Sequence, residues 1–347
     1  MILQILGIII GVVIGLVVLE VLFVGFAPGF SVPKQPLKRS TQVFNNSGTM
    51  EPQSREDVSF MVEGASISGW LYLPEERASP VPCIVMGHGF GGTKDMFLER
   101  YAVRYQEAGF AVLTFDYRYF GESEGEPRQL MWIPYQLEDY TAAVEYARSR
   151  QEIDPARIAL WGTSASGGYG IVVAARDQNI ACVVGQCPAL DPEASGKMLV
   201  KEMGIRHFLR LFFHGQRDMI RSRFGLSPHT IPIVGKPGTL AFFTIPEAYE
   251  GYSNIEPENF VNEVCARVIL TSHGFRPVEH ARNAHCPILI QICECDALVA
   301  ISSETENELR QCADVKSYPI GHFDIYTGDN FERAVNDQID FFKKHLL

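Results

Sequence analysis

The stretch RIALWGTSASGG, residues 157–168, decides the fold, because an apolar run passes there directly into small and hydroxylated residues. RIALWG predicts a short buried strand, and the SGGYGIVVAARD that follows the turn predicts a helix. A tight turn from strand to helix needs small flanking residues, which Gly162, Ser166 and Gly167 provide. Ser164 is therefore predicted to stand on the turn, above the carboxyl edge of the sheet, where open α/β sheets place their sites.

Two other interpretations of this stretch stay open. If the turn motif is aligned two residues later, Ser166 is the nucleophile, although it then lies two residues into the helix. The stretch also suits a helix cap rich in serine and glycine that has no chemical role. Serine is small enough that its presence at position 166, where glycine is more usual, still permits the turn. The sequence therefore favours Ser164 as the reacting hydroxyl.

Strands and helices alternate from Val58 to the C-terminus, so residues 58–347 are predicted to form one domain. Short apolar runs such as PCIVMGH and FAVLTFDYR predict buried parallel strands, and the later YQLEDYTAAVEYARS predicts an amphipathic helix. The expected fold class is α/β, with a mostly parallel central sheet covered by helices. Residues 191–281 break the alternation and are predicted to form an inserted lid.

A nucleophilic serine needs a base and a carboxylate that orients the base. In YPIGHFDIY, His322 comes directly after a predicted strand, and in ILIQICECDAL the carboxylate of Asp296 ends another. We therefore expect Ser164, Asp296 and His322 to meet at the carboxyl edge of the sheet. The rival carboxylates, which are less well placed, are those of Glu294, Asp324 and Asp329.

The stretch GHGFGG, residues 87–92, ends an early strand and leaves its backbone free to turn N–H groups toward a developing oxyanion. The backbone N–H groups of Phe90 and of Ala165, directly after the candidate nucleophile, are the predicted donors. Loss of one such donor typically slows a reaction by about 10²–10³-fold, so these amides matter as much as the three side chains.

Three stretches together, HGFGGTKD, FAVLTFDYRYFGESEGEPRQ and DPARIALWGTSASGG, resemble the α/β-hydrolase superfamily. The resemblance is closest to a branch that includes esterase-like proteins and fungal polyketide acyltransferases or thiohydrolases. Members of that branch usually carry serine at the position of Ser166, so this residue follows a habit of the branch. Two departures are Tyr119, where glycine is usual, and Ala165, where a bulkier residue is usual.

The resemblance implies that Ser164 attacks an acyl carbonyl with His322 as base, and that the acyl-enzyme then passes its acyl group to water. The expected activity is that of a serine hydrolase acting on carboxylic ester or thioester bonds, with no metal and no organic cofactor. An acyltransferase with the same residues and a non-catalytic binding module on this scaffold stay open. The aromatic stretches LRLFFHG and LAFFTIPEAYEGY either pack the lid on the core or line a cavity for an apolar acyl group.

Residues 1–27 are apolar except for Gln4 and Glu20, and no cleavage site for a signal peptidase follows them, so they are predicted to form a transmembrane anchor. Basic residues come only after this run, which places the domain in the cytoplasm of a single-pass membrane protein. Residues 28–57 are predicted to be a linker. The small residues that would let two such helices associate into a homodimer are Gly7, Gly11 and Gly15, although glycine is also simply common in membrane helices.

The formal net charge is −11 and no stretch forms a basic stripe, which argues against nucleic-acid binding. Most of the eight cysteines lie in apolar, strand-like runs, where a free thiol behaves as a small core residue. Cys293 and Cys295 have no second pair at the spacing of a zinc site, so no structural metal is expected.

Overall fold

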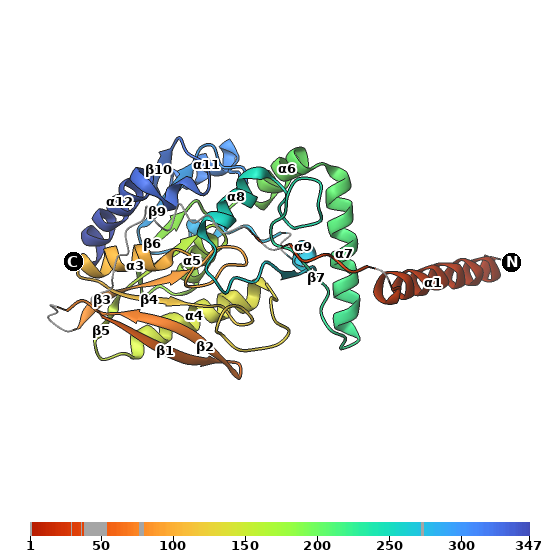
Figure 1. The fold of residues 1–347 in the computed structure, drawn as a ribbon, viewed down its shortest axis with the longest axis horizontal. Coiled ribbons are helices and arrows are strands. Elements are labelled where there is room, and N and C mark those ends of the chain that lie inside the picture. The colour runs from red at the N-terminus through yellow and green to blue at the C-terminus, as the bar shows by residue number, and fades with distance from the viewer. Residues whose placement is uncertain (1, 29, 36, 38–53, 76–79, 272–273) are drawn as a thin grey trace.

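The computed structural model describes the chain except residues 1, 29, 36, 38–53, 76–79 and 272–273, together with the side chains of residues 2–5 and 7–9. Most of the predicted linker therefore lies outside the described residues. The rest forms an α/β domain from which one long N-terminal helix extends (Figure 1).

An eight-stranded sheet lies at the centre of the domain, in the order β1-β2-β4-β3-β5-β6-β9-β10. The first two strands form an antiparallel pair through a turn at Gly64, and β2 runs antiparallel to β4, whereas the other neighbours are parallel. The predicted parallel sheet is thus confirmed, with an antiparallel pair at one edge. The strands are β1 (Arg55–Val62), β2 (Ala65–Tyr72), β3 (Val81–Gly87), β4 (Ala111–Phe115), β5 (Ile153–Thr163), β6 (Ile180–Gln186), β9 (Ile288–Cys293) and β10 (Asp314–Tyr318).

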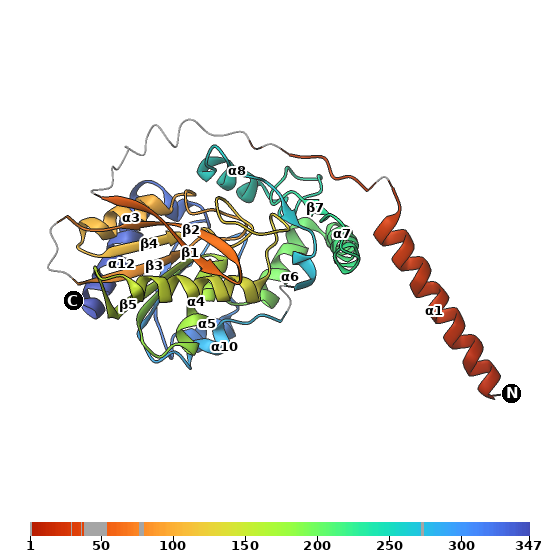
Figure 2. The same cartoon turned by 90° about the horizontal axis from the view of Figure 1, so that it is seen from below.

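Helices cover both faces of this sheet (Figure 2). One face carries α3 (Leu98–Glu107) and α12 (Gly328–Leu346), and the other carries α4 (Ile133–Ser149) and α5 (Ala165–Arg176). Every residue of β3 is buried, because a strand between two helical layers has no solvent-facing side. The near-continuous apolar runs of the sequence are the consequence of this double cover.

Residues 191–281, which were predicted to form a lid and are called the lid below, lie between β6 and β9 and are mainly helical. It contains α6 (Pro192–Met203), α7 (Ile205–Arg223), β7 (Thr230–Ile231), α8 (Pro246–Ile255), β8 (Val264–Cys265), α9 (Val268–Thr271) and α10 (Val278–Ala281). Asp191 caps the first lid helix, because its carboxylate accepts a hydrogen bond from the Ala194 N–H at 2.9 Å. The same carboxylate accepts from the Ser302 and Thr305 hydroxyls near α11 (Ser303–Leu309), which ties the start of the lid to the sheet domain.

Helix α1 (Ile2–Phe26) extends away from the domain (Figures 1 and 2). Its last turn packs on α7, where Arg217 Nη1 donates a hydrogen bond to the Val24 carbonyl at 2.7 Å. A bilayer span needs about 20 consecutive apolar residues, and no helix within the described part of the chain is long and apolar enough to meet that need. The transmembrane helix predicted for residues 1–27, and the single-pass cytoplasmic topology drawn from it, are therefore not supported.

The homodimer contact through Gly7, Gly11 and Gly15 of α1 stays a prediction. A Cβ atom added at Gly11 or at Gly15 would meet nothing within 4 Å, so this surface is open. Gly7 lies among the residues whose surroundings are not described.

Candidate active site

Ser164 directly follows β5 and is the N-cap of α5, with φ 54° and ψ −117°. A positive φ is strained for a residue with a Cβ, and such strain persists only where the surrounding structure enforces it. Here the Ser164 N–H donates to the Gln186 carbonyl at 2.9 Å, and the Ser164 carbonyl accepts from the N–H groups of Gly167 and Ala189. The predicted sharp turn between strand and helix is therefore present, and it is held by backbone bonds on both sides.

The turn leaves no room for larger residues at its flanks. A Cβ atom at Gly162 would lie 2.1 Å from the Ser166 carbonyl oxygen, and one at Gly167 would lie 2.6 Å from Pro188. On the neighbouring strand, a Cβ at Gly87 would lie 2.9 Å from the Cβ of Ser166. The side chain of Ser166 is accommodated because Gly87, on the neighbouring strand, has no side chain at that point.

Ser166 is fully buried inside α5, and its hydroxyl is used for structure. The Ser166 hydroxyl donates to the carbonyl of His88, and it lies 2.7 Å from the hydroxyl of Tyr117, which therefore acts as the donor to it. The Ser164 hydroxyl instead lines two adjoining cavities. Of the two serines considered from the sequence, the geometry favours Ser164 for chemistry.

His322 and Asp296 meet beyond the ends of β10 and β9. His322 Nδ1 lies 2.5 Å from Asp296 Oδ2, and Asp296 Oδ1 accepts the backbone N–H groups of Leu298 and Val299, both at 2.8 Å. Burial lowers the pKa of the His322 imidazole, but the adjacent Asp296 carboxylate and the neighbouring Cys187 together hold that pKa well above its usual value. Both oxygens of the Asp296 carboxylate thus take part in hydrogen bonds, which fixes the orientation of the His322 ring.

The rival carboxylates have other surroundings. Asp324 Oδ2 accepts the backbone N–H of Gly321 at 2.9 Å, so it shapes the loop before His322. Asp329 lies in the first turn of α12. Among the rivals and Asp296, the hydrogen bond to the imidazole belongs to Asp296.

Ser164 and His322 line one small cavity, together with Gly89, Phe90 and Tyr252. Among the hydrogen bonds of the described residues, none joins the Ser164 hydroxyl to the His322 imidazole. Catalytic hydrogen bonds are often long before substrate binds and shorten in the complex. The structure thus brings the three predicted side chains to the same edge of the sheet.

Of the two predicted oxyanion donors, Phe90 lines this cavity and Ala165 directly follows Ser164. Ala165 is the first residue of α5, where helix N–H groups have no partner within the helix. Phe90 follows β3 in the loop that faces Ser164, and a Cβ at Gly89 would lie 3.3 Å from the Cβ of Ser164. In the described part of the chain, neither the Phe90 N–H nor the Ala165 N–H has a hydrogen-bond acceptor, so both are available to a ligand.

Two residues of lid helix α8 support these groups, and neither was predicted as a site residue. Tyr252 donates its hydroxyl hydrogen bond to the Phe90 carbonyl at 2.7 Å. Glu247 Oε1 accepts the backbone N–H of His322 at 2.7 Å, and burial raises the pKa of the Glu247 carboxyl. A Cβ at Gly321 would lie 2.6 Å from the same Glu247 oxygen, which explains the glycine before His322.

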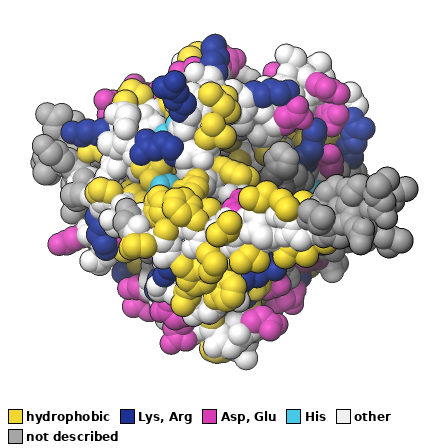
Figure 3. Space-filling model, turned by 90° about the vertical axis from the view of Figure 1, so that its right-hand side faces the viewer, with side chains coloured by type: hydrophobic (Ala, Val, Ile, Leu, Met, Phe, Trp, Pro, Cys, Tyr) yellow, Lys and Arg dark blue, Asp and Glu magenta, His cyan; other side chains and the backbone are white. Residues whose placement is uncertain are grey.

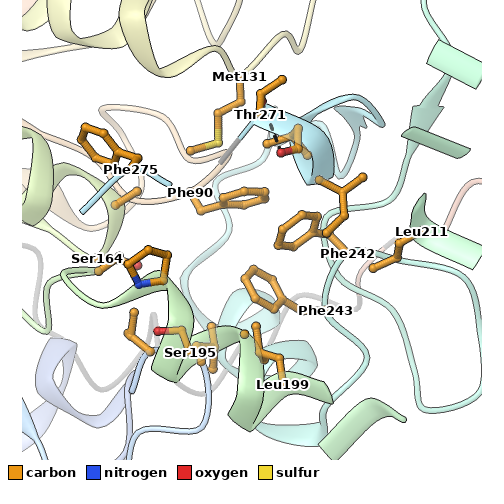
Figure 4. A pocket seen from close by; sticks show the side chains of 18 of the residues that line it. Phe90, Met131, Ser164, Ser195, Leu199, Leu211, Phe242, Phe243, Thr271 and Phe275 are labelled. Atoms are coloured by element: carbon orange, nitrogen blue, oxygen red, sulfur yellow. Dashed lines mark hydrogen bonds between the residues drawn. The ribbon is translucent and has the colours of Figure 1, made fainter. Parts of the chain in front are cut away.

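A second, larger cavity of about 210 Å³ runs from Ser164 under the lid toward α7 (Figure 4). No charged side chain lines it within the described residues. The rings of Phe90 and Phe242 pack against each other with centroids 4.5 Å apart, and Phe243 lies beside them. Other walls come from the core and the lid: Met131, Ile133, Tyr169, Leu199, Met203, Phe208, Leu211, Val268, Ile269, Phe275, Leu298 and Val299.

The parallel sheet, the strained serine at a turn from strand to helix, and the buried pair of histidine and carboxylate define a protein of the hydrolase class. A family model described as "alpha/beta hydrolase fold" matches residues 82–210. The chain is 40% identical over 297 residues to the quorum-quenching protein AidA of Acinetobacter baumannii, covering 84% of this chain and 96% of that protein. The chain belongs to the α/β-hydrolase superfamily, as the resemblance indicated.

Other relatives place the chain in the branch named above. It is 29% identical over 313 residues to the thiohydrolase apmlB of Arthrinium phaeospermum, covering 84% of this chain and 97% of that protein. Polyketide transferases of fungi are also among its relatives. The crystal structure of the α/β hydrolase GrgF from Penicillium superposes with a TM-score of 0.69 at 24% identity, over 84% of this chain and 99% of that one, which shows the shared fold.

Proposed function

We propose that this protein is a serine hydrolase that cleaves carboxylic ester or thioester bonds of an apolar acyl substrate. One observation carries the proposal: Ser164 sits on a strained turn in the same cavity as His322, whose other ring nitrogen is held by Asp296. Strain of this kind at a serine is expected where the turn projects a hydroxyl toward a substrate.

In the proposed reaction, His322 Nε2 takes the proton of the Ser164 hydroxyl as the oxygen attacks the acyl carbonyl. Asp296 keeps the proton on Nδ1 and stabilises the imidazolium that forms. The negative charge on the former carbonyl oxygen accepts hydrogen bonds from the Phe90 and Ala165 N–H groups. The alcohol or thiol then leaves with the proton from His322, and water attacks the acyl-enzyme in the same way and releases the acid.

The apolar cavity supports the choice of substrate. A wall without charged groups would leave a charged acyl chain buried and unpaired, which is costly. An alkyl chain gains about 0.8 kcal/mol for each methylene group that it buries, so longer chains should bind more tightly until the cavity is full. The printed name of one relative, a thiohydrolase, agrees with a thioester as one of the two bond types.

Acyl transfer is the second candidate function. The same apolar wall and the lid above it would keep water from the acyl-enzyme, and polyketide transferases are among the relatives. Transfer and hydrolysis share every step up to the acyl-enzyme. They differ only in whether water or an acceptor alcohol or amine takes the acyl group.

A fluorophosphonate probe tests the proposed nucleophile directly. We expect the native protein to be labelled, Ser164→Ala to be unlabelled, and Ser195→Ala, which changes another serine of the cavity wall, to be labelled as the native protein is. An unlabelled native protein would favour the non-catalytic binding module. A series of p-nitrophenyl esters and acyl thioesters of increasing chain length, with and without an acceptor alcohol, then separates hydrolysis from transfer.

A further inference from the structure

Lid helix α7 carries one broad apolar stripe, of which one side lines the large cavity and the other side is exposed. Its inner face contributes Phe208 and Leu211 to the wall of the large cavity. Its outer face presents Ile205, Leu209 and Phe212, which are 60%, 62% and 48% exposed. These three residues follow one another at helical spacing, so they form a continuous row. A surface helix normally turns its apolar stripe toward the core and its polar residues outward, and α7 departs from that pattern.

Further exposed apolar residues lie beyond the C-terminal end of α7 and on α1. Phe224 and Leu226, just beyond the end of α7, are exposed, and the ring of Phe26 in α1 lies 5.3 Å from that of Phe224. Figure 3 looks onto this side, where hydrophobic side chains lie across the centre and basic side chains lie beside them. The exposed apolar residues of α1 are Leu6, Ile10, Val12, Val13, Ile14, Leu16, Val17, Val18, Leu19, Leu22, Phe23 and Phe26. A continuous apolar surface of this kind marks an interaction site.

The charge of α7 is opposite to that of the whole chain. The chain carries a formal charge of −11, yet α7 contains five arginines: Arg206, Arg210, Arg217, Arg221 and Arg223. Its one acidic residue, Asp218, is buried and bound to Arg267 Nε at 2.6 Å, so it does not offset the exposed arginines. Arg206, Arg210 and Arg223 are exposed beside the apolar row.

We propose that the outer face of α7, with the adjoining surface of α1, docks on a lipid bilayer that contains anionic phospholipids. Exposed aliphatic and aromatic side chains flanked by arginine are the pattern by which a helix lies in the plane of a membrane interface. The basic residues select an anionic surface, because each Lys or Arg near such a surface contributes about 1 kcal/mol. A second copy of the chain fits less well, since the arginines of the two faces would meet.

Docking would place helix α7 between the bilayer and the large cavity. The same helix then touches lipid with Leu209 and the acyl cavity with Leu211. A short path for an apolar acyl substrate from the bilayer to Ser164 follows, and this step alone rests on the proposed function. The docking itself does not depend on which reaction the site performs.

The test uses the full chain with Leu209→Trp and vesicles of phosphatidylcholine that carry brominated acyl chains, with and without phosphatidylglycerol. Met61→Trp is the matched control, because Met61 is 65% exposed on β1, away from α7. The three native tryptophans give a background common to both variants. We expect a blue shift and bromine quenching of the added tryptophan in Leu209→Trp with anionic vesicles, and neither change in Met61→Trp.

A second set of variants tests the contribution of the arginines. In the Leu209→Trp background, Arg206→Gln with Arg210→Gln should raise the lipid concentration needed for half-maximal quenching by about tenfold or more. Arg310→Gln, at the C-cap of α11, with Arg333→Gln, on α12, is the control pair and should leave it unchanged. Quenching no greater in Leu209→Trp than in Met61→Trp would overturn the proposal. A blue shift without vesicles that grows with protein concentration would also overturn it, because it would assign the face to a second copy. Both readouts are independent of activity.

Discussion

Replacing Ser164 by glycine should stabilise the protein while it removes the proposed nucleophile. Ser164 holds φ 54° and ψ −117°, a conformation that costs a residue with a Cβ about 1–3 kcal/mol. Glycine adopts positive φ without that cost, although its unfolded chain is more flexible by about 0.5–1 kcal/mol. The expected net gain for Ser164→Gly is therefore about 1 kcal/mol in the free energy of unfolding. Ser164→Ala keeps the Cβ, so it keeps the strain.

The comparison of Ser164→Gly with Ser164→Ala isolates the backbone effect, because both lack the hydroxyl. For a domain of this size, 1 kcal/mol corresponds to about 1–2 °C in the midpoint of thermal unfolding. Differential scanning calorimetry of the two variants measures the difference, and the fluorophosphonate probe confirms that neither is labelled. A glycine variant that unfolds at or below the temperature of the alanine variant would refute the argument that the turn stores strain at Ser164.

Three further predictions concern the groups around this serine. His322 must be neutral to accept a proton, and Asp296 helps to hold its pKa well above the usual value, so kcat/KM should rise with pH through that raised pKa. Asp296→Asn should shift this rise to lower pH and should lower kcat by about 10⁴-fold. A pH–rate profile of both proteins measures the two effects. Tyr252→Phe removes the hydrogen bond to the Phe90 carbonyl and should lower kcat by about tenfold, with KM for a short ester unchanged. A tenfold rise in KM with kcat unchanged would contradict the assignment to the oxyanion loop. Leu211→Asp places a carboxylate in the apolar cavity and should raise KM for long acyl esters far more than for acetate esters, which a chain-length series measures.

The central strands of the sheet were predictable because they are buried on both faces. Runs such as those of β3 and β5 contain few polar residues, and each ends in glycine or in small residues at the same edge. This common edge is also why Ser164, Asp296 and His322 could be proposed together: each lies within four residues of the end of a different strand. The serine at position 166 was explained by family habit, and the structure adds the physical reason, which is the glycine on the neighbouring strand.

The lid was predictable as an interruption but not as a structure. Helix α7 does show an apolar stripe at helical spacing, which includes Ile205, Phe208 and Phe212, and this signal was missed. Glu247 and Tyr252 were missed because they act on backbone groups of distant loops, and such contacts leave no motif. The transmembrane anchor was inferred from the long apolar run of residues 1–27 and from the absence of a cleavage site after it, and the structure does not support it.

The two hydrogen bonds that α8 makes have a further consequence for the order of events in one turnover. Glu247 steadies the loop of the proposed base and Tyr252 steadies the loop of a proposed oxyanion donor, and both are carried by the same short lid helix. A conformation in which α8 moves aside to admit a molecule therefore gives up both supports together. Entry by that route and bond cleavage would therefore alternate, and the speed with which α8 returns would then set an upper limit on the rate of turnover.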